Sequence, residues 1–234
     1  MVGNYLTLVT AAQGRNFIVA GADSRGTFGH PDVAFSSYDV MQKMVLVAPH
    51  VVVLSYGAGE VGDNLLNEFR EGLQQEQPLI DGVRAILQSL QTFCQQRWNQ
   101  WFVNVPFQFR PVVAYIVAGL ERAQDGDYSV PLIYSMNSRM GFAPAFHRYG
   151  WSHGGVPIYA IYIFGRRYRP DMSVDKLCGL VAYGISETAT QDQRVGGAIR
   201  LMKVLPEGAQ ELNETEIRTV LANYIRESSG VNNE

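Results

Sequence analysis

The feature that most constrains the fold of this chain is the apolar run at residues 112–120, VVAYIVAGL. Arg110 and Pro111 precede this run, and no charged residue interrupts it. A run that is apolar at every position, rather than at alternate positions, is typical of a strand buried on both faces. The run is also far too short to cross a bilayer as a helix. We therefore expect a strand in the middle of a layered, water-soluble fold.

The periodicity of the remaining chain predicts strands in hairpin runs and helices grouped between them. We expect strands at residues 6–12, 17–23, 43–49, 51–56, 112–120, 131–135, 156–164 and 198–205, and helices over 65–73, 80–94, 177–188 and 213–225. Asn213 and Glu216 have the spacing of a capping box at the start of the last helix.

The order of these elements predicts the fold class. It contains no strand–helix–strand alternation and no GxGxxG motif, so we expect an α+β fold in which helices are layered on antiparallel sheets. We expect a single domain over residues 1–234, with a short N-terminal extension at 1–6 and a frayed tail at 228–234.

Composition excludes several classes of function. The formal net charge is −3 and no block of like charges occurs, which argues against a nucleic-acid or membrane partner. The N-terminus lacks the basic and apolar regions of a signal peptide, and Cys94 and Cys178 read as buried thiols, so we expect a cytoplasmic protein. The histidines lack metal-ligand spacing, and we expect neither a metal nor a cofactor.

Charged residues stand at the ends of two apolar runs. The strand at 17–23 ends on Asp23, which is followed by Ser24 and Arg25, and Lys43 opens the run at 43–49. Asp23 and Arg25 could form a surface ion pair, whereas a partnership of Asp23 with Lys43 would indicate a site. Thr7 could equally be an ordinary β-branched strand residue.

Five segments in order resemble the proteasome core-particle subunits, above all the β-type, and their bacterial relatives among the N-terminal-nucleophile hydrolases. They are residues 17–27 (FIVAGADSRGT), 42–49 (QKMVLVAP), 55–59 (SYGAG), 110–119 (RPVVAYIVAG) and 192–197 (DQRVGG), and the resemblance runs from about residue 6 to 225. It implies a four-layer αββα sandwich of two antiparallel sheets flanked by helices. It also implies a threonine-type peptidase that works in a ring of copies on peptides or unfolded proteins, with an ATP-dependent unfoldase as a possible partner.

The same resemblance implies the catalytic residues. Counting back from Asp23 without gaps places the nucleophile at Thr7, and an insertion in the turn at 13–16 would move it toward Leu6 or Tyr5. Asp23 corresponds to the orienting acid, Lys43 to the lysine and Asp192 to the later acid near the nucleophile. In such hydrolases the α-amine of an N-terminal threonine is the general base, and an adjacent lysine favours alkoxide character.

The glycine-rich turn at residues 57–59 would supply the oxyanion donor, from the N–H of Ala58 or Gly59. Met41, Val45 and Tyr56 resemble residues that line the substrate pocket, which implies an apolar pocket.

Some features depart from an active member of the family. Leu6 precedes Thr7, Val195 stands where the family has a serine, and the serine expected near residues 154–155 has no counterpart. Two alternatives therefore stay open: a catalytically inactive ring or scaffold subunit, and an N-terminal-nucleophile amidase or ligase acting on a specific amide.

Overall fold

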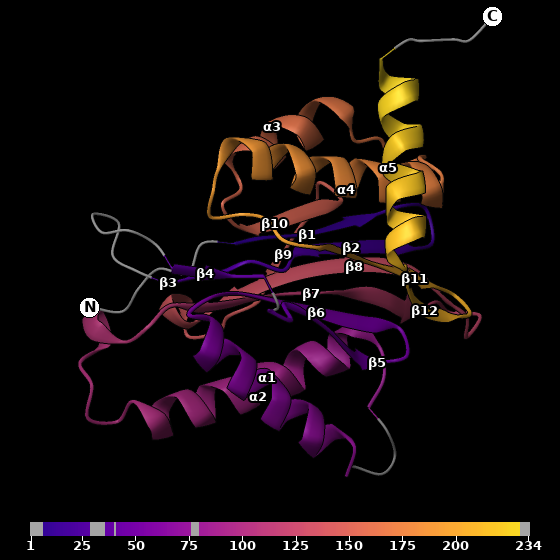
Figure 1. Cartoon of the computed structure of the whole chain (residues 1–234). Helices are drawn as coiled ribbons and strands as arrows, with labels where there is room; N and C mark the ends of the chain where they lie inside the picture. Colours follow the sequence, from indigo (N-terminus) through magenta and orange to yellow (C-terminus); the bar gives the residue numbers. More distant parts are fainter. Residues whose placement is uncertain (1–6, 29–35, 40, 76–79, 230–234) are drawn as a thin grey trace, which may run out of the picture.

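The computed structural model describes residues 7–28, 36–39, 41–75 and 80–229. The predicted extension at 1–6 and the last residues of the predicted tail lie outside these ranges, and Ser228 ends a helix. Within them the chain forms a mixed α/β structure with two antiparallel five-stranded sheets and five α-helices (Figure 1).

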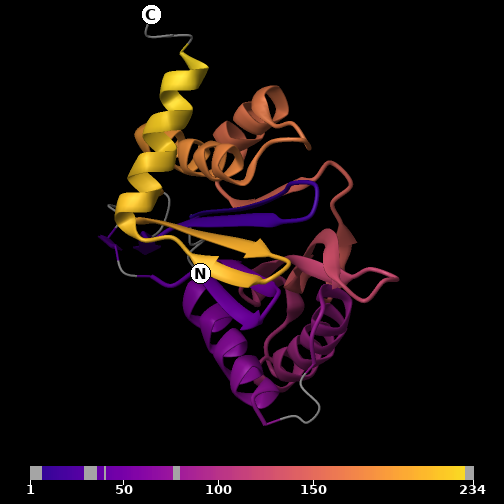
Figure 2. The ribbon, with the colours of Figure 1, turned by 90° about the vertical axis from the view of Figure 1, so that its right-hand side faces the viewer.

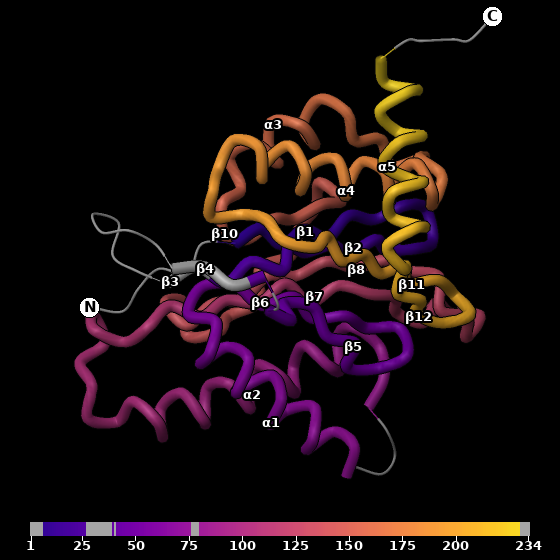
Figure 3. The backbone as a smooth tube through the Cα atoms, in the orientation of Figure 1, coloured from indigo at the N-terminus to yellow at the C-terminus, as the bar shows by residue number. Residues whose placement is uncertain are grey.

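The first sheet joins strands from both ends of the chain. Its order is β10 (Trp151–Gly155), β1 (Leu8–Gln13), β2 (Ile18–Asp23), β11 (Ile199–Leu205) and β12 (Gly208–Glu211). Figure 3 shows β1 and β2, in indigo, beside β10 and β11 from the later part of the chain. The hairpin predicted from strands at 6–12 and 17–23 is confirmed within the described residues, as β1 and β2, and it closes through a hydrogen bond from Gly14 N–H to the Phe17 carbonyl at 2.9 Å.

The second sheet is a meander of consecutive strands. Its order is β5 (Met44–Ala48), β6 (Val51–Gly57), β7 (Val113–Arg122), β8 (Tyr128–Asn137) and β9 (Ala145–Phe146). A separate two-stranded ribbon pairs β3 (Gly26–Phe28) with β4 (Ser36–Tyr38).

Three apolar clusters hold the sheets and helices together. One lies between the two sheets and includes Val9 and Ile116. A second packs the outer face of the second sheet against α1 (Gly59–Leu73) and α2 (Val83–Trp101). The third packs the first sheet against α3 (Ile158–Arg167), α4 (Val174–Gln191) and α5 (Glu214–Ser228). Figures 1 and 2 show these helices on opposite sides of the paired sheets.

Strand β7 is buried on both faces, as the run at 112–120 predicts. Tyr115 and Val117 face the cluster beneath α1 and α2, whereas Ile116 and Ala118 face the cluster between the sheets. The capping box of the last helix is also confirmed, because Asn213 and Glu216 exchange hydrogen bonds at the start of α5. Across the described ranges, no helix combines the length and apolar character needed to cross a bilayer.

The strand predicted at 156–164 is wrong, because this segment forms α3. Its β-branched and aromatic residues favour a strand locally, but Gly155 (φ +91°) and Pro157 turn the chain after β10. Ala160 and Phe164, one helical turn apart, then pack onto the first sheet. Ile158 and Tyr162 are 69% and 62% exposed although one is apolar and the other aromatic. The sequence of α3 therefore lacks the alternation of apolar and polar faces that indicates a surface helix.

Candidate active site

Thr7 and Asp23 meet at one end of the first sheet. Thr7 directly precedes β1 and Asp23 is the last residue of β2, so antiparallel pairing brings them together. The Thr7 Oγ1 hydroxyl donates to Asp23 Oδ1 at 2.5 Å, and the Leu8 N–H donates to the same oxygen at 2.9 Å. The other register alternatives left open by the sequence, Leu6 and Tyr5, lie outside the described residues.

Lys43 reaches the same carboxylate oxygen from the second sheet. It directly precedes β5, and its Nζ donates to Asp23 Oδ1 at 2.7 Å and to the Arg25 carbonyl. Thr7, Asp23 and Lys43 are 4%, 1% and 2% exposed. Burial lowers the pKa of the Lys43 ammonium, while the charge and the hydrogen bond of Asp23 act in the opposite direction.

The second oxygen of Asp23 is held by backbone N–H groups. Gly196 N–H donates to Asp23 Oδ2 at 3.0 Å and Arg25 N–H at 3.3 Å. The carboxylate therefore connects the start of β1, the end of β2, the segment before β5 and the segment before β11.

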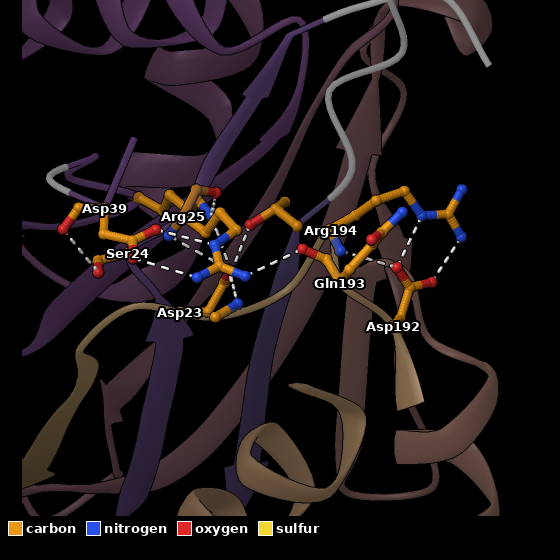
Figure 4. Close-up of polar contacts among 10 residues, drawn as sticks. Asp23, Ser24, Arg25, Asp39, Asp192, Gln193 and Arg194 are labelled. Carbon is orange, nitrogen blue, oxygen red and sulfur yellow. Dashed lines mark hydrogen bonds and ion pairs between the residues drawn. The ribbon is translucent and has the colours of Figure 1, made fainter. Parts of the chain in front are cut away.

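Arg25 does not form the surface ion pair with Asp23 that was one reading of the sequence. Its guanidinium binds both Asp39 oxygens, at 2.8 and 3.1 Å, and donates to the Gln193 carbonyl at 3.0 Å (Figure 4). These contacts lower the pKa of Asp39. Arg25 thus links the segment after β4 to the segment after α4 beside the site.

Asp192 lies at the end of α4, and within the described residues its carboxylate binds Arg194 rather than Thr7, Asp23 or Lys43. The Arg194 guanidinium donates to its two oxygens at 2.7 and 2.5 Å. This contact lowers the pKa of Asp192. Figure 4 shows Gln193 between Asp192 and Arg25, and the Arg194 guanidinium against Asp192. The role that the resemblance implies for Asp192 stays a prediction. Val195 is fully buried in the apolar cluster under α4.

The two N–H groups expected to serve as oxyanion donors, those of Ala58 and Gly59, differ in their hydrogen bonding. Ala58 N–H is already bound to the Val112 carbonyl at 2.7 Å. Gly59 opens α1, and the first N–H groups of a helix have no acceptor within that helix. Gly59 is therefore the better candidate for the oxyanion donor.

The three residues expected to line a pocket are spread over different surroundings. Met41 covers Gly59, since a Cβ added there would lie 2.0 Å from the Met41 methyl carbon. Val45 belongs to the core under α1 and α2, and Tyr56 packs on Gly154 between the sheets. Two surface pockets of about 510 and 550 Å³ lie along α4, against α5 and α3, and their linings contain none of these residues.

Two residues beside the site were not recognised from the sequence. Asp63 on α1 accepts a hydrogen bond from Ser55 Oγ at 3.0 Å, and it interacts electrostatically with Lys43. Gly155 approaches Thr7 so closely that a Cβ would lie 1.8 Å from the Thr7 carbonyl oxygen. The position of Asp63, four residues after Gly59 and so on the same side of a helix, is a signal that could have identified it.

No protein-family model matches the chain, and no curated protein matches it. Among the described residues, no group of three or more His, Cys, Asp or Glu side chains is arranged to hold a metal ion.

Proposed function

We propose that this chain is a proteasome-like, threonine-type peptidase of the N-terminal-nucleophile class. The observation that carries the proposal is the convergence of the Thr7 hydroxyl and the Lys43 ammonium on one oxygen of Asp23. A hydroxyl, a cation and an orienting carboxylate are the groups that such a nucleophile requires.

The proposal includes the fold, which we assign to the four-layer αββα sandwich. The three apolar clusters support this assignment, because they join helices, sheet, sheet and helices in that order. By family resemblance, the working form is a ring of copies that receives peptides or unfolded chains, with an unfoldase as a further partner.

The chemistry would proceed through an ester on Thr7. Thr7 Oγ1 adds to the substrate carbonyl, and its proton passes to the α-amine and then to the leaving amine as the C–N bond breaks. Water then cleaves the ester and restores the hydroxyl. Lys43 stabilises the developing alkoxide, Asp23 orients Lys43, and Gly59 N–H faces the oxyanion.

This mechanism requires a free amine on Thr7, whereas Leu6 now precedes it. The proposal therefore includes cleavage of the bond between Leu6 and Thr7. The free α-amine, with an ordinary pKa of about 7.7–8.0, could then act as the base near neutral pH.

Intact-mass analysis and peptide hydrolysis test the proposal together. We expect the active protein to lack residues 1–6 and to be labelled by a peptide epoxyketone. Thr7→Ala should abolish both hydrolysis and labelling. Thr10→Val is the matched control, because Thr10 is a buried threonine on β1, three residues after Thr7, and it binds Ser152 and His153 rather than Asp23. Retention of residues 1–6, together with equal hydrolysis by Thr7→Ala, would overturn the proposal.

The burial of the cluster favours a second candidate, a non-catalytic ring or scaffold subunit. In this case Lys43 and Asp23 form a structural ion pair joining the two sheets. The expected results are a retained N-terminus, no epoxyketone labelling and a loss of stability in Lys43→Ala.

A further inference from the structure

Asp63 lies near enough to Lys43 to interact with it electrostatically. It lies on α1 next to Gly62, which is on the buried face of that helix. Ser55 on β6 connects the two residues, because its N–H donates to the Lys43 carbonyl at 2.8 Å and its hydroxyl donates to Asp63 Oδ1 at 3.0 Å. A serine that binds both the lysine backbone and the acid holds the carboxyl in place near Lys43.

The charges around Lys43 come from several elements. Asp23 at the end of β2, Asp63 on α1 and Asp39 after β4 all act to raise the pKa of Lys43, against the effect of burial. The Arg25 carbonyl also accepts from its Nζ. Asp63 is the second of these acids in strength, after Asp23.

Asp63 itself titrates in a range where enzymes are commonly assayed. Burial raises its pKa to about 6, although the Ser55 hydrogen bond and the Lys43 charge act to lower it. The neighbouring Tyr115 hydroxyl donates to the Gly62 carbonyl, and burial raises its pKa well above the ordinary value, so it stays neutral there.

We propose that Asp63 is a positioning residue for Lys43: when ionised, it keeps the ammonium charged and directed at Asp23. The catalytic reading of this inference rests on the proposed function, whereas the charge coupling itself does not. In mildly acidic solution Asp63 takes up a proton, and Lys43 then depends on Asp23 for most of its opposing charge. Asp63 thus acts through Lys43 without touching the substrate.

A titration of Lys43 by NMR tests the coupling in the full chain. The chain has only three lysines, Lys43, Lys176 and Lys203, so a spectrum of ¹³Cε-lysine protein contains few signals, and Lys43→Arg assigns the one of interest. In the wild type we expect the Lys43 signal to show an inflection near pH 6 from Asp63. In Asp63→Asn this inflection should disappear, and the Lys43 midpoint should move to lower pH.

Two further variants sharpen the test. Glu60→Gln is the matched control, because Glu60 is an exposed acid on the first turn of the same helix, and it should leave the Lys43 titration unchanged. Ser55→Ala removes the hydrogen bond that lowers the pKa of Asp63, so the inflection should move to higher pH. An inflection that persists in Asp63→Asn would overturn the proposal; should that variant not fold, an unmoved inflection in Ser55→Ala would do so.

The pH dependence of kcat/KM for peptide cleavage separates this inference from the proposed function. If the chain is a peptidase, Asp63→Asn should move the alkaline limb of the profile to lower pH, and Glu60→Gln should not. If no form of the chain cleaves peptides, the proposed function fails while the NMR titration still decides the charge coupling.

Discussion

Lys43 and Asp23 form an ion pair across the two sheets, with 2.7 Å between Nζ and Oδ1 and side-chain exposures of 2% and 0%. Removing both charges from water is unfavourable, so the pair persists because each charge has a close partner and further hydrogen bonds. The same carboxylate oxygen accepts from Thr7, and any change to the pair therefore reaches the candidate nucleophile.

Lys43→Ala should lower the free energy of unfolding by about 3–5 kcal/mol, because it leaves the Asp23 carboxylate buried without its cation. Adding Asp23→Asn should restore part of the loss, since the unpaired charge is then removed. Urea unfolding followed by circular dichroism measures both. If Lys43→Ala alone were as stable as the wild type, this interpretation of the ion pair would be wrong.

Gly155→Ala should lower the free energy of unfolding by at least about 1–3 kcal/mol. Gly155 has a φ of +91°, and its new Cβ would lie 1.8 Å from the Thr7 carbonyl oxygen, so Thr7 must also shift. Gly165→Ala is the control: no atom lies within 4 Å of a Cβ at this α3 position. Gly165→Ala should raise the free energy of unfolding by about 0.5–1 kcal/mol, because alanine has a higher helix propensity than glycine.

Asp63→Asn should raise stability above pH 6 and leave it unchanged below about pH 4. The pKa of Asp63 is raised from 3.8 to about 6 in the folded chain, so its contribution is fully present below pH 3.8 and is lost as the pH rises through 6. The corresponding gain is about 3 kcal/mol at most. Chemical unfolding at several pH values between 4 and 8 provides the comparison. If Asp63→Asn were less stable than the wild type at pH 7.5, burial of the ionised Asp63 carboxylate would not be destabilising, and this prediction would be wrong.

His153 should make the protein less stable in acid. Burial, then the charge of His147, lowers the pKa of His153 from 6.5 to about 3, so the unfolded chain binds a proton that the folded chain excludes. Stability is therefore complete above pH 6.5 and falls as the pH drops toward 3, by about 5 kcal/mol at most. His153→Gln should flatten this decline, which unfolding experiments between pH 4 and 7 would show. An equally steep decline in the variant would assign the acid sensitivity to other groups.

Cys94 and Cys178 should be unreactive toward a thiol reagent in the native protein. Both are buried free thiols, and burial raises the pKa of Cys178 to about 12 and that of Cys94 further above its ordinary value. Because the thiolate is the reactive form, DTNB at pH 8 should label neither in buffer and both in urea. Rapid labelling without denaturant would show that the helices open.

Local patterns in the sequence predicted most of the secondary structure. The run at 112–120 and the capping box at Asn213 depend on residues that are neighbours in the chain, and both are confirmed. The prediction missed β10 and the short strands β3, β4, β9 and β12, and it gave a strand in place of α3, where β-branched and aromatic residues favour a strand. There the turn at Gly155 and Pro157 and the packing of Phe164 outweigh local preference.

The sequence by itself determined the hairpin that ends on Asp23, the strand buried on both faces and the glycine turn before α1, because spacing and residue type specify these features locally. Only the tertiary structure decided which charges meet. It placed Thr7 and Lys43 on one Asp23 oxygen, Asp192 on Arg194, and Asp63 beside Lys43 through Ser55. Ion pairing in a buried site depends on distance in space and on loss of solvent, and neither quantity can be read from positions along the chain.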